Sequence, residues 1–180
     1  TRNRLEFGVN HGAFYVGYIQ RYDYTLRFND ETAALYYREE NDLAYPEGDV
    51  PVRLHAWHSR AQGVKFAWHW QPFPGLSVQP SLSLLNGWEF QDGSLQGFLR
   101  HQDDVLTGQA DLVYRYTDDL LLDHQFDKPA GRGFALDLLL RWQVDQHSAE
   151  LEIQDLYGRL RWRQAPYTFG KFNTVDRGAS

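Results

Sequence analysis

Long runs of alternating apolar and polar residues constrain this chain more than any other feature. The alternation recurs from about residue 13 to residue 163, and it is clearest in 52–59, 64–71, 76–84, 106–116 and 134–144. Successive side chains of a β-strand point to opposite faces of a sheet, so this period predicts strands with one apolar and one polar face. Helix signals are weak almost everywhere. We therefore expect an all-β, antiparallel fold of roughly eight to ten strands.

Turn-forming residues separate these runs. The dipeptides Asn86-Gly87 and Asp92-Gly93 are strong signals for two-residue hairpins. The segment 72–75 contains two prolines, which cannot donate to a strand ladder, and it predicts another break. No internal repeat or linker divides the chain, so we expect one domain over residues 1–180.

The alternation changes phase near the C-terminal end. The apolar residues are odd-numbered at Leu151 and Ile153 but even-numbered at Leu156. Such a slip predicts either a β-bulge near Asp155 or two separate elements.

Composition excludes several classes of protein. The chain has no Cys, which rules out disulfides, Cys-based zinc sites and a thiol nucleophile. Its formal net charge is −6 with scattered basic residues, so we expect no nucleic-acid partner. An aromatic content of 16% is unlike that of disordered chains. No apolar run approaches the ~18 residues of a membrane helix.

Two kinds of surroundings explain an alternating sheet. In a soluble sandwich or a lipocalin-like barrel the apolar face is the core, whereas in an outer-membrane barrel it meets lipid. Several runs, such as 13–28 and 149–163, are at least as long as the ~9–11 residues of a membrane-spanning strand. Aromatic residues lie near the ends of the apolar faces, as in membrane barrels, although aromatics favour strands in any sheet. Fifteen of the eighteen basic residues are Arg, which suits ion pairs held partly out of water.

These features resemble the outer-membrane β-barrel proteins of Gram-negative bacteria, over about residues 4–163. The resemblance implies an antiparallel up-and-down β-barrel in the outer membrane, with the lipid bilayer around it and a polar lumen inside. It implies transport or export of a polar solute or polysaccharide, or a structural role in the cell envelope. Such proteins typically end on an aromatic residue, but here eight residues follow Phe172. We therefore also expect that the chain could be incomplete at one or both ends and part of a larger barrel.

The alternative is a soluble protein, periplasmic or secreted. It would be a β-sandwich that binds carbohydrate, or a lipocalin-like barrel that carries a small ligand. Trp57, Trp88 and Tyr45 suit a platform for sugar rings, although strand packing explains aromatics more often.

The polar faces supply the candidate lumen residues, which would provide selectivity or a salt-bridged plug. They are Arg53, His55, His69, Arg115, Asp137, Arg141, Glu150 and Glu152. The assignment of polar strand positions to the lumen also places Arg159 and Arg161 on this face. If 52–59 and 64–71 paired as a hairpin, His55 would lie opposite His69, and a third ligand would complete a metal or proton site.

Catalytic patterns are lacking in the sequence. There is no Gly-x-Ser-x-Gly turn and no Gly-rich phosphate loop. Adjacent carboxylates such as Glu39-Glu40 suit solvated turns better than acid–base pairs. The sequence therefore favours a role other than an enzyme, and we expect no catalytic residue, bound metal or cofactor.

Overall fold

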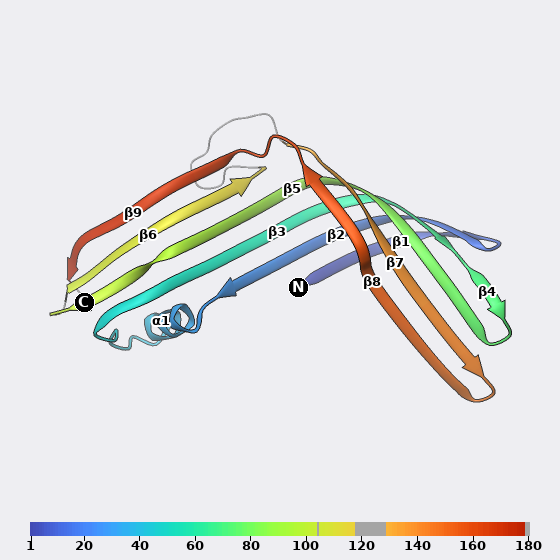
Figure 1. Ribbon diagram of the computed structural model, residues 1–180, viewed down its shortest axis with the longest axis horizontal. Coiled ribbons are helices and arrows are strands. Elements are labelled where there is room, and N and C mark those ends of the chain that lie inside the picture. The colour runs from blue at the N-terminus through green and yellow to red at the C-terminus, as the bar shows by residue number, and fades with distance from the viewer. Residues whose placement is uncertain (104, 118–128, 179–180) are drawn as a thin grey trace.

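The computed structural model describes residues 1–103, 105–117 and 129–178. It confirms the antiparallel all-β class: nine strands form one sheet, accompanied by one helix (Figure 1). The strands are β1 (Arg2–His11), β2 (Phe14–Phe28), β3 (Gly48–Trp68), β4 (Trp70–Phe73), β5 (Leu76–Gln102), β6 (Val105–Tyr116), β7 (Gly131–Val144), β8 (His147–Trp162) and β9 (Tyr167–Gly178), and the helix is α1 (Asp30–Glu40).

The nine strands follow an up-and-down order. β6 and β7 pair with successive parts of the same edge of β5, and β9 and β8 pair with β6 and β7 in turn. Chain order is therefore spatial order: β1, β2, β3 with β4, β5, β6 with β7, and β9 with β8, each antiparallel to its neighbour. The described strands do not close into a barrel, because β1 and the β8–β9 side remain the two open edges of the sheet.

Figure 1 shows the sheet bending into two limbs where β6 gives way to β7. One limb carries β1, β7 and β8, and we call it the β7–β8 limb; the β6–β9 limb carries β6, β9 and α1. β5 runs through both. At the bend the register of β3 against β5 shifts between Arg60 and Ala61, whose partners are Glu89 and Gly87, so Trp88 is an extra, bulged residue.

The turns differ from the prediction in one respect. The break at 72–75 is confirmed, since β4 ends at Phe73 and Gly75 has a φ of +86°. The hairpin prediction for Asn86-Gly87 and Asp92-Gly93 is wrong, because both dipeptides lie inside β5. Their pairing with β3 on one side and with β6 or β7 on the other overrides the local turn preference.

The condition considered for 52–59 and 64–71, pairing as a hairpin, is not met. Residues 52–59 and 64–68 belong to the single strand β3, and β2 pairs with it along its length from Leu54 to Trp68. The intervening residues include Gly63, which is itself paired, so the chain does not reverse there.

The bulge predicted near Asp155 is confirmed. Leu136 lies opposite Tyr157 while Leu138 lies opposite Ile153, and Asp155 has a φ of +53°. Asp and Asn enter this left-handed region more readily than most residues. Three residues of β8, 154–156, lie opposite Asp137 alone, so the bulge contains two extra residues and the faces of the residues after it are not exchanged. Arg159 therefore lies opposite Phe134 on the apolar face, and the assignment of Arg159 and Arg161 to the face of Glu152 is wrong.

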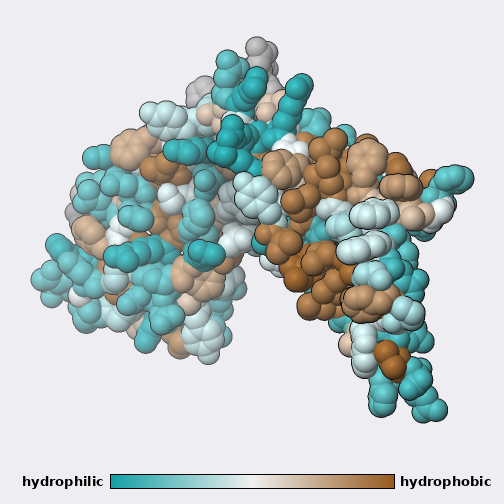
Figure 2. Space-filling model, turned by 45° about the vertical axis from the view of Figure 1, so that its right-hand side comes forward, coloured by the Kyte–Doolittle hydropathy of each residue, from teal (hydrophilic) through white to brown (hydrophobic). Residues whose placement is uncertain are grey.

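The two faces of the β7–β8 limb differ sharply. One row of directly opposed residues crosses six strands and is entirely apolar: Val9, Val16, Phe66, Leu82, Leu136 and Tyr157. Many large side chains on this face stay exposed, among them Phe7 (61%), Leu84 (52%) and Leu151 (54%). Figure 2 shows apolar side chains gathered on this limb.

The opposite face is concave and lined by small residues at its centre. Ile19, Ala61, Leu85 and Ala135 form a buried cluster there, against which Leu160 packs. Gly63, Gly87 and Gly133 lie on the same rows. Small side chains in the middle strands let the flanking strands approach each other across the concave face.

Helix α1 was not anticipated. It has no buried residue, so it lacks the apolar stripe that reveals most helices. Its available signals were Asn29 at the N-cap position and two acidic residues in the first turn. Asn29 Oδ1 accepts a hydrogen bond from the backbone N–H of Arg53 (3.1 Å), which ties the start of the helix to β3.

Candidate functional site

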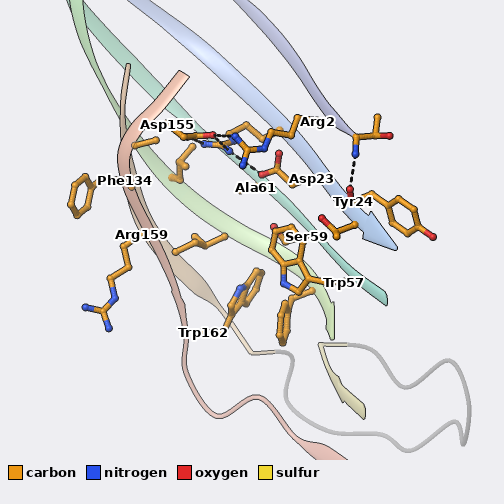
Figure 3. A pocket seen from close by; sticks show the side chains of 18 residues that line it. Arg2, Asp23, Tyr24, Trp57, Ser59, Ala61, Phe134, Asp155, Arg159 and Trp162 are labelled. Carbon is orange, nitrogen blue, oxygen red and sulfur yellow. Dashed lines mark hydrogen bonds and ion pairs between the residues drawn. The ribbon is translucent and has the colours of Figure 1, made fainter. Parts of the chain in front are cut away.

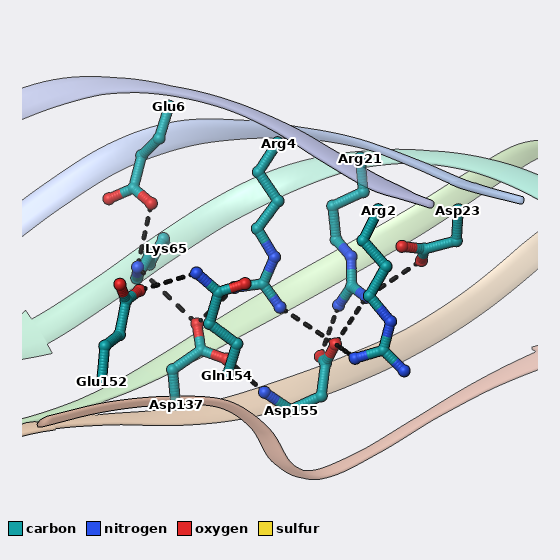
Figure 4. A network of polar contacts seen from close by, with 10 residues as sticks. All are labelled: Arg2, Arg4, Glu6, Arg21, Asp23, Lys65, Asp137, Glu152, Gln154 and Asp155. Atoms are coloured by element: carbon teal, nitrogen blue, oxygen red, sulfur yellow. Dashed lines mark hydrogen bonds and ion pairs between the residues drawn. The ribbon is translucent and has the colours of Figure 1, made fainter.

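A cluster of charged side chains crosses the concave face of the β7–β8 limb (Figure 4). On one side stand Arg2 and Arg4 of β1, Arg21 and Asp23 of β2, and Lys65 of β3; on the other stand Asp137 of β7 and Asp155 of β8. These seven residues are called the ionic cluster below. The cluster joins β1 and β2 to β7 and β8 through side chains rather than through backbone pairing.

Asp155 is the hub of the ionic cluster. Arg21 donates to both of its carboxylate oxygens, at 2.7 and 2.9 Å, in the forked geometry that a guanidinium favours. Arg4 lies 3.0 Å and Arg2 3.2 Å from the same carboxylate. The bulge explains this position, because a left-handed residue turns the Asp155 side chain onto the concave face beside that of Gln154.

Asp137 is the second anchor. Its Oδ2 accepts a hydrogen bond from Arg4 (3.0 Å) and lies 3.6 Å from Lys65 Nζ, while its Oδ1 accepts the backbone N–H of Asp155 (2.8 Å). Asp137 is only 6% exposed. The last contact fixes the backbone of the bulge, so the Asp137 carboxylate helps to position Asp155 for the arginines.

A cavity of about 450 Å³ adjoins the ionic cluster, and we call it the concave cavity (Figure 3). Arg21, Asp23 and Asp155 line its charged side, and Trp57, Phe90 and Trp162 line its aromatic side. Phe90 and Trp162 stack with ring centroids 5.3 Å apart and an angle of 22° between the rings. Ala61, Leu85 and Ala135 contribute to its lining from the buried cluster.

Glycines make room for Trp162. A Cβ on Gly87 would lie 2.5 Å from the Trp162 ring, and one on Gly131 would lie 2.9 Å from it. Gly87, Gly131 and Trp162 are directly opposed across β5, β7 and β8, so the indole lies over the backbone of two neighbouring strands. Trp162 therefore belongs to the concave face.

The predicted candidate residues all lie on strand positions or turns of the concave-side face, but they do not form one site. Asp137 belongs to the ionic cluster, and Glu152 borders it, accepting a hydrogen bond from Gln154 at 2.8 Å. Arg141 and Glu150 form a separate, half-exposed ion pair at 2.7 Å between β7 and β8. Arg53 and Arg115 are exposed on the β6–β9 limb.

The two histidines are apart, so the condition for a shared His55–His69 site is not met. His55 Nε2 lies 2.8 Å from Asp92 Oδ1 on β5. His69 lies just after β3, at the other end of the sheet, and its Nδ1 is 3.3 Å from Ser77 Oγ. Within the described residues no group of three His, Cys, Asp or Glu side chains is placed to hold a metal ion.

Most of the ionic cluster was missed by sequence reasoning. Arg21, Asp23 and Lys65 fall on the polar side of the alternation, but nothing in the sequence distinguishes them from other polar strand residues. Arg21 and Asp155 are 134 positions apart, and only the curl of the sheet brings them together. The phase slip at Asp155 was the one local signal.

The segment between α1 and β3 carries one perturbed group. The Tyr45 hydroxyl donates a hydrogen bond to the Glu39 carboxylate, and this contact is the main reason that the pKa of Tyr45 is raised. The backbone oxygen of Tyr45 lies 3.2 Å from His101 Nδ1 on β5. This segment is therefore held against the sheet, away from the concave cavity.

Comparisons with protein-family models, with curated proteins and with solved structures found no match. Among the described residues, no helix is both long enough and apolar enough to cross a membrane.

Proposed function

We propose that this chain forms the wall of an outer-membrane β-barrel, with its convex apolar face against lipid and its concave face toward the lumen. The observation that carries the proposal is the contrast between the two faces of the β7–β8 limb. An apolar row crosses six strands and all of its side chains except that of Leu136 are exposed, while the opposite face buries paired charges. Lipid-facing and lumen-facing residues of outer-membrane barrels alternate in this way.

The ionic cluster favours a structural role in the envelope over an open pore. Its side chains span the concave face from β1 to β8, in the space where a wide lumen would lie. Narrow barrels fill their interiors with side chains in the same manner. The alternative role is transport of a polar solute, which would need a larger barrel that also includes strands from outside this chain.

Detergent dependence and lipid contact test the proposal. We expect the purified chain to need detergent, to migrate differently on gels before and after boiling, and to insert into phospholipid vesicles. In vesicles with brominated acyl chains, bromine should quench Trp142, which is 43% exposed on the apolar face. The Trp142→Phe variant should therefore lose part of the quenching, whereas Trp57→Phe, on the concave face, should not.

The soluble alternative makes the opposite prediction. A chain that stays monodisperse without detergent and shows no quenching by brominated lipid would overturn the membrane proposal. The concave cavity would then favour a secreted protein that binds a small ligand.

A further inference from the structure

We propose that three arginines on the convex face bind the phosphate group of an anionic lipid. They are Arg132 of β7 and Arg159 and Arg161 of β8, and we call them the arginine patch. The assignment rests on the proposed function, in which the convex face meets lipid. It adds the class of lipid that this face would select and the residues that would select it.

The strand register brings the arginine patch together on the convex face. Arg132 lies directly opposite Arg161, and Arg159 lies directly opposite Phe134. All three arginines are exposed. Figure 3 shows the side chains of Arg159 and Phe134 pointing away from the concave cavity, which lies on the other face of the sheet. Residues two apart on a strand are about 7 Å apart, so the three long side chains can reach one phosphate group.

The arginine patch is unpaired, unlike the arginines of the ionic cluster. Its guanidinium groups make no hydrogen bond or ion pair with any side chain in the part of the chain that the structure describes. Arg132 and Arg161 are instead like charges on directly opposed positions, an arrangement that destabilises a sheet. An anion bound between the two arginines would relieve this repulsion.

Charge on the convex face is scarce and mostly positive. Among the described strand residues of this face, the Arg, Lys, Asp and Glu side chains are Arg60, Arg132, Arg159, Arg161 and Glu89. Glu89 is already engaged, because its carboxylate lies 3.0 Å from Arg60 and 3.1 Å from His58. The described convex face therefore offers the arginine patch no acid of its own, and an anionic ligand would complement it.

The arginine patch lies where the apolar surface ends. One row of opposed residues is apolar apart from Tyr18 and Arg159: Phe7, Tyr18, Val64, Leu84, Phe134 and Arg159. The next row toward the bend is polar apart from Leu5: Leu5, Gln20, Gln62, Asn86, Arg132 and Arg161. An acyl chain on the apolar rows would bring its headgroup to this level, where guanidinium groups bind phosphate oxygens in pairs. A lipid therefore fits better than a free phosphate ion, which gains nothing from the apolar rows.

The test is a count of the lipids that stay bound to the chain. The whole chain is inserted into vesicles of phosphatidylglycerol and phosphatidylcholine in equal amounts and with the same acyl chains. It is then extracted in a mild nonionic detergent, and native mass spectrometry identifies the lipids that remain. Each basic residue near an anionic membrane surface strengthens the attraction by about fivefold, so phosphatidylglycerol should exceed phosphatidylcholine by about tenfold or more.

Two triple variants locate the site. The patch variant carries Arg132→Gln, Arg159→Gln and Arg161→Gln, and it should bring the ratio of the two lipids close to one. The control variant makes the same change of charge at exposed arginines of the concave-side face and should keep the preference: Arg27→Gln, Arg53→Gln and Arg115→Gln. The patch variant loses a repulsion, so urea should unfold it at no lower concentration than the unaltered chain.

A further arm separates a lipid site from a site for a free anion. An excess of inorganic phosphate should displace no more phosphatidylglycerol than sodium chloride of the same ionic strength does. Greater displacement by phosphate would overturn the assignment to a lipid. No preference for phosphatidylglycerol, or an equal loss of preference in the two triple variants, would overturn the site itself. A chain that inserts into vesicles but shows no preference refutes the lipid site alone, whereas a chain that does not insert refutes the membrane proposal as well.

Discussion

Replacing Asp155 with Asn tests whether the ionic cluster holds the two sides of the curled sheet together. The substitution removes the negative charge that three arginines share. It keeps the shape of the side chain, and Asn accepts the left-handed backbone at φ +53° as readily as Asp does. The bulge should therefore persist, and the measured effect should come from the charge.

The three arginines that contact Asp155 contribute unequally to the free energy of unfolding. Arg2 is 63% exposed, so its pair contributes less than about 1 kcal/mol. Arg21 and Arg4 are 10% and 13% exposed, and breaking a buried pair by removing one partner costs about 3–5 kcal/mol. Both arginines keep a second carboxylate, Asp23 and Asp137, which reduces the loss. We expect Asp155→Asn to lower the free energy of unfolding by about 2–3 kcal/mol.

Urea unfolding followed by tryptophan fluorescence measures this loss. With a slope of about 1–3 kcal/mol per molar urea, the midpoint should fall by about 1 M or more. Asp145→Asn is the matched control, because exposed Asp145 in the β7–β8 turn has the same φ of +53° but none of these arginines. It should change the free energy by less than about 0.5 kcal/mol. Equal, small shifts in both variants would refute the view that the cluster stabilises the fold.

Two further substitutions probe the bend and the apolar face. Gly87→Ala should destabilise the chain by about 1–3 kcal/mol in the same urea assay, because the new Cβ would press on Trp162. Gly93→Ala, whose Cβ would lie 3.4 Å from Tyr114, should be tolerated. Equal effects of the two substitutions would contradict the packing argument. Leu84→Arg should make the free energy of folding into vesicles less favourable by about 2–4 kcal/mol if this position lies near the centre of the bilayer. Gln96→Arg, on the concave-side face, should not. Unchanged insertion of Leu84→Arg would contradict the assignment of lipid to the convex face.

The faces of the sheet could be predicted from the sequence because the alternation is a direct consequence of strand geometry. The same reasoning located the bulge near Asp155, but the bulge contains two extra residues, so the faces of the residues after it are not exchanged and Leu160 lies on the concave face. Turn dipeptides were less informative. Asn86-Gly87 has a strong local preference for a hairpin, yet strands on both sides of β5 pair with it and hold it extended.

The ionic cluster could not be predicted for a different reason. The alternation places Arg21 on the polar face but leaves open which residue across the concave face lies within reach. That choice depends on how far the sheet curls, which small residues such as Ala61 and Ala135 determine together. The hypothetical pairing of His55 with His69 does not form for a related reason, because it required a turn within β3, where the chain continues as one strand.

The irregularities of this sheet converge on the concave cavity. The bulge at Trp88, the end of β6 and the start of β7 meet at one level, where Thr117 donates its backbone N–H to Phe90 and Gly131 lies opposite Gly87. The bulge at Asp155 carries its carboxylate to the edge of the same space. A regular sheet would continue its alternation through this level and leave neither a left-handed carboxylate nor an indole over glycines. The departures from strand periodicity therefore create a place where buried charges and stacked aromatic rings face each other, and it is at such departures that sites are expected in a sheet.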